Sequence, residues 1–342
     1  MKVNLLAGHA PLVSLLAVAA LSACGGGGSS STTNEPASAT PVPEKALSLT
    51  SSNYQSASQQ ALSAGNYLLN SGDLLNGAQA GAAPSALGVA VKQLPGLLKQ
   101  FKRPALLAGA VISDSKPCSD GGKIDFTLTD SNNNGLPDEG ESVVMVANAC
   151  KEGSSLMAGR IEISMSKLSG VFDSTNFSAT IGMKLDNFSV TTPTSSSIGK
   201  GELKLSIASS SATQTSLQIE APNFSSSGRM GALEYQQTMT GFVISISTTT
   251  QANGQSTDSA IFRGTFSSTA LEGKTLSIDT PIALTMPSNL NYPTAGKLVI
   301  KGANNSVVQM TVQPNGRVLI ELDADGNGSF ETSVNKAWSE LY

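Results

Sequence analysis

The chain has 342 residues, of which 13% are charged and 5% are aromatic, and its formal net charge is −4. This acidic balance argues against nucleic-acid partners, because phosphate backbones are bound by basic surfaces. The scarcity of aromatic rings also argues against a stacking platform for sugars or bases.

The first 23 residues are typical of an exported protein. Lys2 gives a positive start, and residues 12–20, LVSLLAVAA, form an apolar run that is too short to span a bilayer. Leu21-Ser22-Ala23-Cys24 follows at once and resembles the lipobox of bacterial lipoproteins. The resemblance implies that residues 1–23 are a signal peptide and that lipid is attached to Cys24. An ordinary secretory signal with an incidental cysteine is the alternative.

The resemblance also implies a location. Residue 25 is Gly rather than Asp, which in lipoproteins favours the outer membrane over retention at the inner one. We therefore expect an outer-membrane anchor, with the folded part in the periplasm or on the cell surface. Residues 24–52 open with GGGGSSSTTNEPASATPVPE, which is too poor in apolar side chains to pack, so we predict a flexible tether there.

Cleavage before Cys24 would exclude several kinds of active site and metal site from the mature chain. The only histidine is His9, within the signal peptide, so the mature chain has no Ser-His-Asp triad, no Cys-His pair and no histidine metal ligand. Once Cys24 is acylated, only Cys118 and Cys150 remain, and an even pair in an exported protein predicts a disulfide.

Residues 53–110 are predicted to be helical. Tyr54, Ala57, Ala61, Ala64 and Leu68 fall on one side of a 3.6-residue period. A second amphipathic segment covers residues 83–104, and Pro95 should kink or split it. We expect these helices to pack on the sheet that follows.

From Lys123 onward the apolar period changes to two. Ten or more segments alternate apolar and polar residues, as in Ile161, Ile163 and Met165, and no helix of crossover length separates them. Residues 111–342 are therefore predicted to be a mainly β domain. We expect a large antiparallel meander that forms a curved sheet, a sandwich or a partly open barrel.

The stretch from Cys118 to Cys150 is predicted to be a β-hairpin. If Thr129 faces Ser142, both cysteines fall at the open end of the hairpin. They are then slightly out of register with each other, and a bend at Gly121-Gly122 can absorb that offset. The order of Cys118, Gly121-Gly122, the Asx-Gly loop, Gly140-Glu141 and Asn148-Ala149-Cys150 resembles a module of uncharacterised bacterial lipoproteins. No activity is implied by that resemblance.

Two acidic loops match the oxygen-rich pattern of calcium-binding loops. The alternative in both is a plain hairpin turn in which an Asn-Gly pair supplies the positive φ angles. The second loop has Val334 where the pattern has a carboxylate, so it is the weaker match. Calcium is the one cofactor that the sequence suggests, with candidate ligands Asp130, Asn132, Asn134, Asp138 and Glu141 in the first loop and Asp323, Asp325, Asn327 and Glu331 in the second.

No spacing of residues marks a catalytic site, so the leading prediction is a non-enzymatic structural or binding module of unknown ligand. A carrier of an apolar ligand, such as a lipid or acyl chain, is one alternative, because Met165, Met183, Met239 and Met310 lie among the aliphatic residues of the predicted apolar face, which apolar helices would cover. A hydrolase based on carboxylates or on a Ser/Lys pair is the other.

Overall fold

The computed structural model describes residues 46–72, 85–90, 111–132, 138–170 and 175–341. The predicted lipid-bearing Cys24, the first part of the predicted tether, and most of the second predicted helix lie outside the described residues. Within the described residues, the second segment is helical at 86–90.

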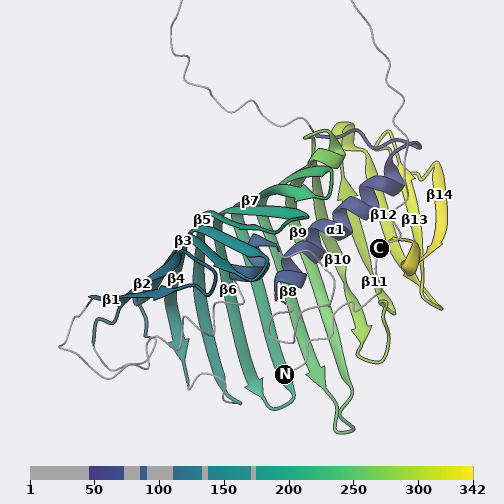
Figure 1. Ribbon diagram of the computed structural model, residues 1–342. Helices are drawn as coiled ribbons and strands as arrows, with labels where there is room; N and C mark the ends of the chain where they lie inside the picture. The colour runs from purple at the N-terminus through teal and green to yellow at the C-terminus, as the bar shows by residue number, and fades with distance from the viewer. Residues whose placement is uncertain (1–45, 73–84, 91–110, 133–137, 171–174, 342) are drawn as a thin grey trace, which may run out of the picture.

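In the described residues, fourteen strands form one open, curved, antiparallel sheet, and they pair in sequence order from β1 to β14 (Figure 1). This confirms the mainly β meander and selects the curved sheet among the predicted forms. The strands are β1 (Val111–Pro117), β2 (Lys123–Thr129), β3 (Ser142–Glu152), β4 (Ser155–Ser169), β5 (Phe177–Thr191), β6 (Ser195–Ser211), β7 (Gln214–Met230), β8 (Leu233–Thr250), β9 (Ser256–Ser268), β10 (Thr275–Pro287), β11 (Ala295–Lys301), β12 (Val307–Gln313), β13 (Arg317–Asp323) and β14 (Thr332–Ala337).

One face of the sheet is apolar and buried. In β4, Ile161, Ile163 and Met165 are at most 3% exposed, while the residues between them are half-buried. This alternation is what a strand with one face on the core requires. The same pattern continues through β13, where Val318, Ile320 and Leu322 are buried.

Helix α1 (Tyr54–Gly72) runs diagonally across the apolar face (Figure 1). Its buried side is the predicted one, formed by Tyr54, Ala57, Ala61, Ala64 and Leu68. Because three of these side chains are alanine, the helix lies close to the strands. At Gly65 an added Cβ would lie 2.7 Å from the ring of Phe262 in β9, so a larger residue there would force that ring or the helix to shift.

Residues 46–52 differ from the predicted tether. Ala46 forms a parallel bridge with Thr275 at the start of β10, and the Leu47 amide donates to the Thr275 carbonyl at 2.9 Å. Leu49 is 1% exposed. The chain therefore joins the sheet at residue 46, several residues before α1 begins.

A row of β-bulges crosses the middle of the sheet. Register shifts interrupt the pairing of β3 with β4 after Ala147, of β4 with β5 after Ala158, and of β5 with β6 after Leu185. Further shifts follow between β6 and β7, between β8 and β9, and between β10 and β11. A bulge bends its strand, so an aligned row bends the whole sheet. We call this row the crease.

Glycines permit close contact between strands at the crease. Gly201 in β6 has a φ of +123°, and an added Cβ there would collide with the Asn223 carbonyl oxygen of β7. Phe224, the next residue, is 1% exposed, and its ring lies 6.4 Å from that of Tyr67 in α1. The crease thus places an aromatic side chain of the sheet against the helix.

Cys118 and Cys150 form the predicted disulfide, with their Cα atoms 5.5 Å apart. Thr129 faces Ser142 as expected, and Gly121 and Gly122 both have positive φ. Cys118 lies in the turn between β1 and β2, so the bridge ties the first hairpin of the sheet to the third strand. The cross-link is therefore near an edge of the sheet, since β1 is an edge strand.

Candidate metal centre

The two acidic loops lie at opposite ends of the strands. The first follows β2 and the second follows β13, and these strands run in opposite directions because neighbouring strands are antiparallel throughout. The two sets of candidate ligands therefore form two separate sites rather than one.

In the first loop, Glu141 is bonded to the backbone at both ends of the loop. Its side chain is 1% exposed, and its two carboxylate oxygens accept hydrogen bonds from the amides of Ser131 at 2.9 Å and Asp138 at 3.0 Å. The Asn132 side chain donates to Asp138 at 2.6 Å. Asn134 lies outside the described residues. Glu141 thus clamps the two ends of the loop together.

In the second loop, the backbone wraps around one buried carboxylate. Asp323 is 4% exposed, and its oxygens accept hydrogen bonds from the amides of Gly326 at 2.7 Å, Asn327 at 3.1 Å and Gly328 at 2.8 Å. These bonds fix the loop around the Asp323 side chain and hold the positions of the residues that follow.

The second loop also brings its other candidate ligands together. The Asn327 side chain donates to Asp325 at 2.9 Å, and Glu331 accepts from the Ala324 amide at 2.9 Å. One carboxylate oxygen from each of Asp323, Asp325 and Glu331 lies within 4.8 Å of the other two. Oxygens bound to one calcium ion at about 2.3–2.6 Å are at most about 5 Å apart, so these three could share an ion.

The two loops differ in how their described candidate ligands are arranged. The first has the better match to the ligand pattern, but no comparable group of its carboxylates is found among its described residues. The second lacks a carboxylate at Val334, yet its three carboxylates converge. Asp325 and Glu331 are exposed, so water could supply further ligands.

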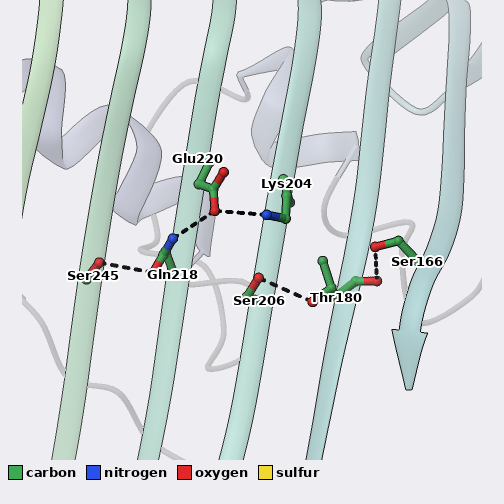
Figure 2. A network of polar contacts seen from close by, with 7 residues as sticks. All are labelled: Ser166, Thr180, Lys204, Ser206, Gln218, Glu220 and Ser245. Atoms are coloured by element: carbon green, nitrogen blue, oxygen red, sulfur yellow. Dashed lines mark hydrogen bonds and ion pairs between the residues drawn. The ribbon is translucent and has the colours of Figure 1, made fainter. Parts of the chain in front are cut away.

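The sheet face away from α1 is polar, and its side chains bond to one another across the strands (Figure 2). Lys204 forms an ion pair with Glu220 at 3.1 Å, and Gln218 donates to the same carboxylate at 2.7 Å. Ser166 donates to the Thr180 carbonyl at 3.1 Å, and longer contacts of 3.4–3.5 Å link Thr180 with Ser206 and Ser245 with Gln218.

A shallow hollow of about 290 Å³ lies on this polar face between β5 and β9. Its lining is rich in hydroxyl groups, such as those of Ser206, Ser216 and Ser245. Of the lining residues, all in the described part of the chain, none is charged or aromatic. A serine there has no lining group that could act as its general base.

One carboxyl group lies on the apolar face. Asp258 of β9 is 4% exposed, two residues from buried Ala260, and accepts a hydrogen bond from the Thr248 hydroxyl at 2.5 Å. Burial raises the pKa of Asp258, and the Thr248 hydrogen bond offsets this only in part. Ionised Asp258 therefore destabilises the fold.

The substitution Asp258→Asn should raise the melting temperature at pH 7. The native pKa lies above the unfolded value of about 3.9, so the penalty is absent below that value and complete above the native pKa. The gain should therefore shrink as the pH falls towards 4. Melting curves at several pH values would measure it, with the exposed Asp186→Asn as control. An Asp258→Asn protein that melts below the wild type at pH 7 would contradict the assignment.

No family model, curated protein or solved structure matches the chain. None of the helices in the described residues is both long enough and apolar enough to cross a bilayer. The functional argument therefore rests on the residues and their geometry.

Proposed function

We propose that the chain is a lipoprotein anchored to the outer membrane through Cys24, and that its β domain is a non-enzymatic structural or binding module. The observation that carries the proposal is Leu21-Ser22-Ala23-Cys24 at the end of an apolar run. The entry of the chain into the sheet at Ala46 supports it, because residues 25–45 then separate the anchor from the folded domain.

Metabolic labelling with an alkyne-bearing fatty acid tests the anchor. The wild-type chain should incorporate the label and fractionate with outer membranes, and Cys24→Ser should lose the label. Cys118→Ser serves as the matched control, since it removes a different cysteine and should keep the label. Equal labelling of the wild type and Cys24→Ser, or an unlabelled wild type, would overturn the proposal.

A second candidate function is calcium binding by the loop after β13. The observation that favours it is the convergence of Asp323, Asp325 and Glu331 within 4.8 Å. All three come from one short loop, so the expected role of the ion is to rigidify that loop. The ion would also neutralise mutually repelling carboxylates, which favours binding to the folded chain.

Thermal melting with calcium and with a chelator tests this second function. Calcium at a free concentration 100 times its Kd should stabilise the domain by about 2.7 kcal/mol, a shift of several degrees. The shift should vanish in Asp325→Asn/Glu331→Gln. Asp138→Asn in the first loop is the control and should keep it. Asp323 is left unchanged because it holds the loop without an ion. Coincident wild-type curves would exclude the site.

A carrier of an apolar ligand is the alternative proposal for the β domain. The four methionines that suggest it, Met165, Met183, Met239 and Met310, are at most 3% exposed and belong to the core. Because these methionines are buried, we interpret the apolar face as a packing surface for α1. For this reason we place the structural or binding module before the carrier.

A further inference from the structure

The hairpin between β7 and β8 ends in an exposed apolar tip. Met230 and Leu233 pair across the turn and are 60% and 73% exposed. The two residues between them are Gly231 and Ala232, so the tip carries no charge. The Gly231 amide donates to the Thr194 carbonyl at 2.9 Å, which ties the tip to the turn between β5 and β6. The apolar tip is thus held in place by a neighbouring turn.

The tip lies at the end of the sheet where the chain enters. β7 finishes and β8 begins at this end, and β10 begins there at Thr275, the residue that pairs with Ala46. Only β9 separates β8 from β10, so at about 4.8 Å per strand these two strands are roughly 10 Å apart. The apolar tip and the root of the tether therefore share one side of the domain.

The number of residues between the proposed anchor and Ala46 limits how far this side can lie from the anchor. Residues 25–45 are 21 residues, and a chain of that length spans at most about 75 Å even when it is fully extended. Tethering raises the effective concentration of the tip at the anchoring surface to roughly the millimolar range, so a weak contact is sufficient.

From these observations we infer that the Met230-Gly231-Ala232-Leu233 tip inserts into the lipid surface to which the chain is anchored. The inference rests on the proposed anchor at Cys24. Apolar side chains at the headgroup boundary gain burial, and a second attachment point makes a single lipid anchor hold more firmly. The contact would fix the domain with this end of its strands facing the bilayer.

A tryptophan reporter tests the inference in the full-length lipoprotein. Leu233→Trp and, as a control, Val111→Trp would each be reconstituted into vesicles whose acyl chains carry bromine. Val111 is 64% exposed, but it is the first residue of β1. It therefore lies at the end of the strands opposite to the tip, which follows the end of β7. The wild type supplies the background from Trp338, the single native tryptophan, which is 3% exposed.

The Leu233→Trp emission should shift to shorter wavelength and be quenched by bromine, and that of Val111→Trp should do neither. Protein that floats with vesicles but leaves Leu233→Trp unquenched would overturn the tip contact alone. Protein that does not float would overturn the anchor and the tip contact together. A blue shift that depends on protein concentration without vesicles would identify a second copy as the occupant, which also overturns the inference.

Discussion

Phe224→Ala is expected to lower the free energy of unfolding by about 3–5 kcal/mol, the range for truncating a buried phenylalanine. The side chain is 1% exposed and contacts Tyr67 of α1. Its removal leaves a cavity where the creased sheet meets the helix. Gly199 and Gly201 in the neighbouring strand β6 have no side chains that could fill that space.

Urea unfolding of the purified domain would measure this loss. Phe330→Ala is the matched control, because Phe330 is 40% exposed and the same truncation there should change stability by at most about 1 kcal/mol. Similar losses in the two variants would show that the contact between the crease and α1 contributes little to stability.

Replacing Cys118 and Cys150 together by Ser is expected to reduce stability by about 3–4 kcal/mol. The bridge joins residues 32 positions apart, and on the chain-entropy model closing a loop of that length restricts the unfolded chain by this amount. Urea unfolding of the wild type with and without reductant should give the same difference. The double variant is its own control, since reductant should not change its stability. A wild type that reductant leaves unchanged would contradict the prediction.

Much of the fold could be predicted because it depends on side-chain periodicity. Ile161, Ile163 and Met165 alternate with polar residues and are buried in β4. The register of Thr129 with Ser142, a hypothesis that placed both cysteines at the open end of the hairpin, is observed. The buried side of α1 followed from its 3.6-residue period.

Strand β1 could not be predicted in the same way. Its sequence, VISDSKP, has no sustained alternation, and its residues are mostly exposed, so no buried face produced a pattern. It is a strand because it pairs with β2, from Val111 opposite Thr129 to Pro117 opposite Lys123. Tertiary pairing rather than local preference determines such a segment.

The crease left a trace in the sequence that periodicity does not detect. The tripeptide Asn-Phe-Ser occurs at 176–178, 187–189 and 223–225. The copies at 187–189 and 223–225 lie opposite Gly159 and Gly201 at the crease, and their phenylalanines are buried. The copy at 176–178 lies at the start of β5, away from the crease, so the tripeptide alone would not have located the bend.

The arrangement of the candidate calcium ligands could not be predicted from the ligand pattern. A ligand pattern counts oxygen-bearing side chains, but it does not show whether backbone amides already occupy them. Backbone amides bond to both oxygens of Glu141 in the first loop, and they also bond to Asp323, Asp325 and Glu331 in the second. Among the described residues, what sets the second loop apart is that its three carboxylates converge. Only the folded backbone distinguishes these two situations.

The two edge strands of the open sheet, β1 and β14, also affect whether copies of the chain can associate. A free sheet edge offers backbone donors and acceptors to any passing strand, which is a route to aggregation. The outer strand β1 carries Asp114, Lys116 and Pro117, and β14 has only six residues, including Lys336. Charge, proline and shortness all disfavour the addition of a further strand. These features disfavour edge-to-edge association between copies of the domain.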